Sequence, residues 1–228
     1  MAKINELVYD VREAVEQFSS DSDLDNRYII YLYNIKRAKY LRQDLNNFQK
    51  SWDNSIMQTF CVPMEIVSAE TCSRNLECTR ILRSKVPLPK AIELTDKVAI
   101  SRVKPTNITS LPFTFLSLER GLYFNKSRFP KSIYAFIDTD NYLYAVSENE
   151  SMFLINCITV SGIFEDPLSL QEFKDCCDCK DSNVCFDPLE SEYPLQPHYI
   201  DLIKNEIVNE VLRKLEIPQD KNNNARED

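Results

Sequence analysis

The sequence predicts an α+β fold, in which helices at both ends of the chain pack with a central, mainly antiparallel β region. Apolar residues recur every three to four positions at both ends, whereas residues 59–164 hold short β-branched and aromatic runs separated by Pro, Asn, Asp and Ser. With 228 residues, 43% of them hydrophobic, the chain is long enough to bury a core. We expect four segments: an N-terminal helical region at 1–55, a β-rich region at 56–166, a cysteine-containing loop with a C-terminal helix at 167–217, and a C-terminal arm at 218–228.

Two helices are expected in the N-terminal region. The first presents a one-sided apolar face made of Ile4, Leu7, Val8, Val11, Val15 and Phe18, with Glu6, Asp10, Glu13 and Glu16 off that face. The second follows SSDSD, with Ser22 as a predicted N-cap, and runs to about Phe48. Its apolar arc is wide: Tyr28, Tyr31, Leu32, Ile35, Leu41 and Leu45. Such an arc fits a subunit of an oligomer and also a buried central helix of a monomer.

Strands and a last helix follow. Five runs read as strands, at 59–67, 97–103, 132–138, 142–147 and 154–164. The clearest hairpin spans 132–146, with turn residues at Asp138 to Asn141, and both of its faces carry large apolar groups. These faces must be covered by the chain's own fold or by a neighbouring subunit. The last helix has Pro197 in its first turn, ends near Ile217, and repeats apolar residues at Ile200, Ile203, Ile207, Val211 and Leu215.

Composition excludes several kinds of site. With only two glycines, Gly121 and Gly162, the chain can contain neither a GxGxxG loop nor a Walker A motif. The single histidine, His198, begins a predicted helix and is expected at the surface. The net charge of −8 argues against tight binding of nucleic acid, and the basic cluster Lys36, Arg37, Lys39 and Arg42 scatters around its helix. We find no nucleophile elbow, HExxH or kinase motif, so we expect no enzyme activity, no catalytic residue and no cofactor.

The segment DCCDCKDSNVCFDP at residues 175–188 contains four cysteines, Cys176, Cys177, Cys179 and Cys185. The N-terminus has no signal-peptide pattern, and no stretch approaches the about 18 apolar residues of a membrane span, so we expect folding in a reducing cytosol. Disulfides are then disfavoured. Cys72 and Cys78 repeat the C-x5-C spacing of Cys179 and Cys185, which keeps a zinc site open, although zinc pairs are usually spaced by about two to four residues.

A redox role for these thiols is a second interpretation. Asp175, Asp178 and Asp181 surround them, and negative neighbours raise the pKa of a thiol, which opposes a reactive thiolate. The interpretation we favour is that the cysteines act as small hydrophobic residues that hold a loop. No metal-ligating residue is assigned.

Several stretches, taken together and in order, resemble the ring-forming head-to-tail adaptor proteins of crAss-like bacteriophages. The likeness covers residues from about 3 to 216, and its most particular pieces are VSGIFEDP and DPLESEYPLQPHYIDLI. The other stretches are IKRAKYLRQ, TFCVPMEIVSAETC, CTRILRSKVPLPKAIEL, SIYAFID and NYLYAVS. None of these is a catalytic motif.

The resemblance implies a structural virion protein with an architecture like that of short-tailed phage tail adaptors. Such a protein forms a homo-oligomeric ring, a dodecamer if it shares the portal's symmetry, in the connector below the portal. Its partners would be the portal and neighbouring tail rings, with DNA and cargo proteins passing through the channel and no membrane involved. The C-terminal arm would reach onto an adjacent ring. The alternative is a cytosolic metal- or redox-responsive regulator built around the cysteine loop.

Overall fold

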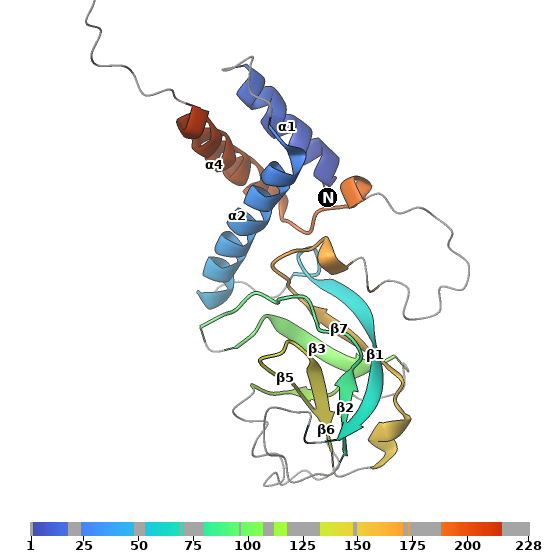
Figure 1. The fold of residues 1–228 in the computed structure, drawn as a ribbon. Helices are drawn as coiled ribbons and strands as arrows, with labels where there is room; N and C mark the ends of the chain where they lie inside the picture. Colours follow the sequence, from blue (N-terminus) through green and yellow to red (C-terminus); the bar gives the residue numbers. More distant parts are fainter. Residues whose placement is uncertain are drawn as a thin grey trace, which may run out of the picture. The chain divides into compact units, whose positions relative to one another are not determined.

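The computed structural model describes residues 2–17, 24–47, 53–68, 70, 80–95, 97–106, 112–117, 133–147, 150–170, 173 and 188–215. The chain divides into two compact units. Residues 1–37 and 189–228 form one, called here the helical unit, and residues 38–188 form the other, called the sheet unit. The described residues contain three α-helices and a seven-stranded, mostly antiparallel sheet, which confirms the α+β class (Figure 1). The four-segment division stays a prediction.

Helix α1 (Ile4–Glu16) confirms the first predicted helix. Five of the six residues of the predicted apolar face are buried: Ile4, Leu7, Val8, Val11 and Val15. The sixth, Phe18, lies outside the described residues. The Glu6 carboxylate accepts a hydrogen bond from the Lys3 backbone N–H at 3.0 Å, which satisfies one of the donors that a helix start leaves open.

Helix α2 (Asn26–Asn46) begins later than predicted. Asp25 is its N-cap, because the Asp25 Oδ1 accepts a hydrogen bond from the Arg27 backbone N–H at 3.0 Å, whereas Ser22 lies outside the described residues. The predicted apolar arc is also partly wrong. Its members Leu32 and Leu41 are buried, but Tyr31 and Ile35 are exposed. The other buried positions of α2 are Ile29, Tyr33 and Arg37, which the predicted arc did not include. A pattern based on hydrophobicity alone missed that a tyrosine and an arginine face inward.

The third predicted helix is confirmed as α4 (Pro197–Leu215). Tyr199, Ile203, Ile207 and Val211 are buried, at spacings of four. The start of the chain pairs with the segment that precedes α4, because the Ile4 N–H donates to the Ser191 carbonyl at 3.2 Å. Both ends of the chain therefore contribute to the helical unit.

The sheet unit contains strands in the order β3-β7-β1-β2-β6-β5-β4. Neighbours are antiparallel except β4 and β5, which are parallel. The bounds are β1 Gln58–Ser68, β2 Arg80–Ser84, β3 Ile100–Pro105, β4 Thr114–Phe115, β5 Tyr134–Ile137, β6 Leu143–Val146 and β7 Cys157–Gly162. All five predicted strands are present. The one predicted at 154–164 begins later, because Glu150–Leu154 forms a 3₁₀ helix, η3. A second 3₁₀ helix, η5, spans Pro188–Glu190.

Strand β1 organises the sheet. Its first half pairs with β7 and its second half pairs with β2 (Figure 1). The change of partner falls between Pro63 and Met64. The two edges of the sheet also meet, because the Phe113 N–H, just before β4, donates to the Val103 carbonyl of β3 at 2.7 Å. The sheet therefore curls on itself, which leaves little of either edge open.

Alternate residues of β1 line the main core of this unit. Phe60, Val62 and Met64 are buried there with side chains from β6 and β7. The Phe60 ring lies edge-on to Phe164, with centroids 5.2 Å apart. A smaller core within the sheet unit includes the end of α2. It is formed by Leu41, Ile56, Ile92, Ala99 and Ile163.

The predicted hairpin is confirmed, and the chain's own fold covers both of its faces. Ala135, Leu143 and Ala145 face the main core, whereas Tyr134, Phe136, Tyr144 and Val146 form a separate cluster with Ile81. The Phe136 and Tyr144 rings stack at 5.7 Å. Asn141 takes the left-handed conformation (φ 61°) that a tight turn needs. The sequence left open whether the chain itself or a neighbouring subunit covers the two faces of the hairpin. The structure shows that the chain itself covers them.

Candidate assembly surfaces

The interior of the helical unit fixes the helices that carry its exposed faces. The buried Arg37 lies at the centre of this interior. The Arg37 side chain is fully shielded from solvent. Its Nε donates to the Pro194 carbonyl at 2.8 Å, and its Cζ lies 5.8 Å from the centroid of the Tyr193 ring. The Tyr193 hydroxyl donates to the Asn34 Oδ1 at 2.7 Å. These contacts fasten the segment before α4 to the side of α2.

Tyr33 completes this interior. Its ring meets Tyr193 edge-on, with centroids 6.1 Å apart. Burial, and to a smaller extent the carboxylates of Asp10 and Asp201, raises the pKa of Tyr33 well above its ordinary value. The phenol therefore stays neutral at neutral pH.

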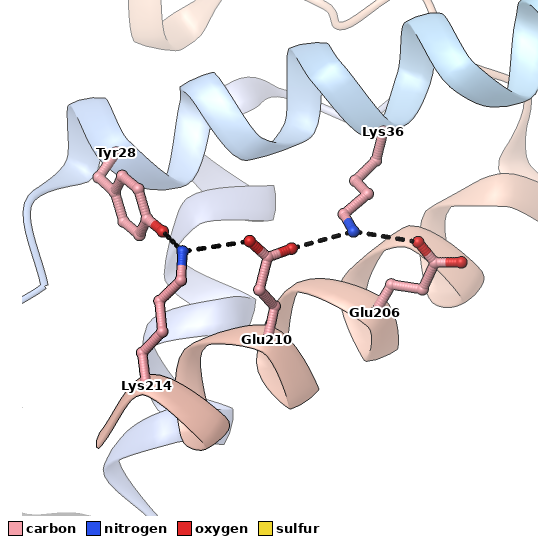
Figure 2. Close-up of polar contacts among 5 residues, drawn as sticks. All are labelled: Tyr28, Lys36, Glu206, Glu210 and Lys214. Carbon is pink, nitrogen blue, oxygen red and sulfur yellow. Dashed lines mark hydrogen bonds and ion pairs between the residues drawn. The ribbon is translucent and has the colours of Figure 1, made fainter. Parts of the chain in front are cut away.

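A ladder of charges joins α2 to α4 along the side of this interior (Figure 2). The Lys36 Nζ lies 3.0 Å from a Glu210 carboxylate oxygen and 3.4 Å from Glu206. The Lys214 Nζ lies 3.2 Å from the other Glu210 oxygen and donates to the Tyr28 hydroxyl. The hydrogen bond to Glu210 raises the pKa of Lys36, and the hydrogen bond from Lys36 lowers the pKa of Glu210. Both partners are held in their charged forms.

Large apolar side chains are exposed on all three helices. Tyr9 of α1 is 65% exposed, Tyr31 of α2 58%, and Ile35 of α2 and Leu202 of α4 44% each. Ile66, Val86 and Leu154 are exposed in the sheet unit. Single exposed apolar residues are ordinary, but aromatic side chains such as Tyr9 and Tyr31 are enriched at protein interfaces.

The predicted basic cluster does not form one surface. Arg37 is buried and Lys36 joins the ladder, whereas Lys39 and Arg42 are exposed. The Arg42 guanidinium group forms a long ion pair with the Glu165 carboxylate, at 3.7 Å. The predicted scatter around the helix is confirmed, and the burial of Arg37 was not predicted. Arg37 can be buried because its long stem is apolar and its guanidinium group meets the Pro194 carbonyl and the Tyr193 ring.

His198 is exposed at the start of α4, as predicted, and its ring lies 4.0 Å from that of Tyr199. The cysteine segment, Cys176 to Cys185, and the pair Cys72 and Cys78 lie outside the described residues. Cys61 and Cys157 are half-buried, and the Cys61 Sγ lies 3.8 Å from the Thr159 hydroxyl oxygen. Across the residues that the structure describes, no three His, Cys, Asp or Glu side chains are close enough to hold a metal ion.

No helix in the described part of the chain is long and apolar enough to cross a membrane.

Sequence reasoning missed the ladder of Figure 2. Lys36 was recognised as part of a basic cluster, but its partners Glu206 and Glu210 lie 170 or more positions along the chain. The available signal was local: on α4 the two glutamates and Lys214 are spaced by four, which aligns them on one helix face. This spacing predicts a row of charged side chains on α4, but it does not identify the helix that packs against that row.

Comparison with known proteins defines the class as structural ring proteins of phage virions. The chain belongs to the family of phage tail ring protein 2, whose family model matches residues 6–228. It is also similar to Ring protein 2 of Bacteroides phage crAss001, with 27% identity over 229 residues, which cover 98% of this chain and 96% of that protein. The predicted resemblance to crAss-like phage ring proteins is confirmed.

Proposed function

We propose that the chain forms a closed ring of identical subunits in the connector between the capsid and the tail of a phage virion, below the portal. The observation that carries this proposal is the family match, which extends over residues 6–228. The ring would surround the channel through which the genome and cargo proteins leave the capsid. The chain would act as a structural part and not as an enzyme, and it would be synthesised in the cytoplasm of the host bacterium.

The charge of the chain supports a place beside the channel. With a net charge of −8, its surface repels the phosphate backbone on average, so DNA can slide past without being held. The exposed Tyr9, Tyr31 and Ile35 support lateral contact between subunits. The hairpin at 132–146 is a poorer candidate for such contact, because the chain already buries its apolar side chains.

The number of subunits and the neighbours follow from the resemblance. A ring that shares the portal's symmetry would be a dodecamer, and its partners would be the portal or another tail ring. An architecture like that of short-tailed phage tail adaptors belongs to the same proposal. Electron microscopy of the purified chain, alone and mixed with its portal, tests it directly. Rings that stack coaxially on the portal are expected, and a chain that stays monomeric in both samples would overturn the proposal.

The C-terminal arm, residues 218–228, is proposed to reach onto an adjacent ring. Deleting it should leave the chain's own ring intact and weaken stacking of that ring on its neighbour. Stacked and single rings can be counted in electron micrographs of the mixture. Full stacking by the shortened chain would contradict the role of the arm and leave ring formation unaffected.

A further inference from the structure

Helix α1 exposes a mainly acidic face. The one basic side chain of this helix, Arg12, is half-buried and lies 3.9 Å from the Glu16 carboxylate at the end of that face. Its exposed residues, within Ile4–Glu16, are Asn5, Glu6, Tyr9, Glu13 and Glu16. Glu6, Tyr9, Glu13 and Glu16 follow spacings of three and four, so they form one row along the helix, about 15 Å long at 1.5 Å per residue. Tyr9, 65% exposed, lies between the carboxylates. This row is called the acidic row.

Helix α2 exposes a face of the opposite sign. Its exposed residues are Arg27, Tyr31, Ile35, Lys39, Arg42 and Gln43. The first four are spaced by four and form a row about 18 Å long, with two apolar side chains between two basic ones. No acidic side chain is among the exposed residues of Asn26–Asn46. The row Arg27, Tyr31, Ile35 and Lys39 is called the basic row.

The two rows match each other in length, in charge and in apolar content. Within one chain they do not cover each other, because all eight side chains remain exposed. Tyrosine and arginine are enriched at the centres of protein interfaces, and opposite charges at the rim select the partner and its register. A ring needs a heterologous contact, in which two different patches meet, because a contact between two copies of the same patch closes as a dimer.

We propose that the acidic row of one subunit docks on the basic row of the next, and that this contact repeats around the ring. The partner of each row is a second copy of this chain. The inference rests on the proposed function and adds to it the two surfaces that make the lateral contact. Tyr9 packs between Tyr31 and Ile35 of the neighbour, and Glu13 faces Arg27 or Lys39.

Two matched variants disable one row each. Tyr9→Ala with Glu13→Lys disables the acidic row, and Arg27→Glu with Tyr31→Ala disables the basic row. Each removes one tyrosine and reverses one charge at positions spaced by four. Because all four residues are exposed, the helical content by circular dichroism should equal that of the unchanged chain. Asp201→Lys with Leu202→Ala makes comparable changes on the exposed face of α4 and is the control.

Sedimentation velocity of the full chain, with its portal if rings require it, measures the result. Each disabled variant alone should assemble at least about tenfold more weakly than the unchanged chain, because the contact loses a buried aromatic group and gains a repulsion. The control should form rings. In a mixture of the two variants, each contributes one intact row, so they should form one-to-one dimers. The two altered rows carry opposite charges again but have lost both tyrosines, so they should join these dimers much more weakly.

The outcomes separate the two proposals. If the unchanged chain and both variants all form rings, the assignment of the rows is overturned and the ring proposal stands. If the control loses its rings as well, or the mixture yields no dimer, the assignment is also overturned. If the unchanged chain never forms a ring, alone or with the portal, the proposed function fails and this inference fails with it. Ring loss in both variants, with dimers in the mixture, supports both.

Discussion

At the scale of single residues, Gly162, the last residue of β7, occupies a position where no larger residue fits. A Cβ at this position would lie 2.7 Å from the Ala99 carbonyl oxygen and 3.3 Å from the Ile100 Cα. The carbonyl cannot retreat easily, because it accepts a hydrogen bond from the Ile163 N–H at 2.8 Å. Close approach of two backbones therefore requires glycine here.

We predict that Gly162→Ala destabilises the protein by about 1–3 kcal/mol, because the added methyl group forces β3 and β7 apart. Urea unfolding followed by circular dichroism measures the change. The matched control is Ser161→Ala, the adjacent half-exposed residue, which loses one hydrogen bond to Thr59 and should unfold within about 0.5 kcal/mol of the unchanged chain. An unchanged midpoint for Gly162→Ala would show that the strands can shift without cost.

Arg37 is the second residue whose environment sets a clear expectation. Replacing it with Met keeps the apolar stem but removes the donor to the Pro194 carbonyl. A buried acceptor left without its donor costs about 1–3 kcal/mol. The free energy of unfolding should therefore fall by that amount, as measured by urea titration. Lys39→Met, on the exposed side of the same helix, is the control and should change stability little. Equal stability of the two variants would contradict the role given to Arg37.

At the scale of elements, how well the sequence predicted the structure depended on how one-sided each pattern was. The face of α1 was predicted correctly because apolar and acidic residues separate cleanly around the helix. The buried side of α2 was not, because Tyr31 and Ile35 look like core residues and Arg37 looks like a surface residue. Hydrophobicity alone cannot predict which of these side chains is buried in the chain, because apolar side chains occur both in a protein core and at protein interfaces.

Strands show the same limit. The hairpin was predicted because alternation and turn residues occur within one short stretch. Strands β2 and β4 were missed, because RILRS places arginine at two of its five positions and β4 has only two residues. Strand β2 lies between β1 and β6, and β4 pairs with β5, but the residues of β2 and β4 alone do not identify these partners.

The ladder between α2 and α4 makes stability depend on pH. Glu210 has a lowered pKa in the folded state, so its contribution is present above the ordinary glutamate pKa and is lost as the pH falls through the folded value. Lys36 has a raised pKa, so its contribution is present below the ordinary lysine pKa and is lost as the pH rises through the folded value. The pair therefore stabilises the fold between about pH 5 and pH 10.

We predict that Glu210→Gln lowers stability near neutral pH by about 1 kcal/mol, the upper end for partly exposed pairs, and by less near pH 3. Unfolding by urea at both pH values measures the difference. Glu93→Gln, an exposed residue whose lysine neighbour lies 3.9 Å away, is the control and should show no such dependence. A loss that is the same at both pH values would mean that Glu210 acts by packing and not by charge.

At the scale of the whole molecule, the chain order hides the organisation into units. The helical unit is assembled from both ends of the chain, and the Tyr193 N–H donates to the Ala2 carbonyl at 3.0 Å to join them. The sequence predicted helices at both ends but not that they share one unit, because nothing in a periodic pattern identifies the partner of a face. The sheet unit is the insertion between these ends, and its edges already meet within it.

An insertion that closes its own edges and buries its own core should fold alone. We predict that residues 38–188, expressed as a separate fragment, unfold cooperatively in urea, because the main core and the hairpin cluster lie wholly inside that range. A fragment of residues 48–188 tests the smaller core: it lacks Leu41, which packs with Ile92 and Ile163, and should lose about 2–5 kcal/mol. A gradual transition of the longer fragment would contradict the prediction, since it would show that the sheet unit needs the helical unit to fold. Equal stability of the two fragments would show instead that the sheet unit folds without the end of α2. Helix α2 would then be only a covalent link between two units that fold independently.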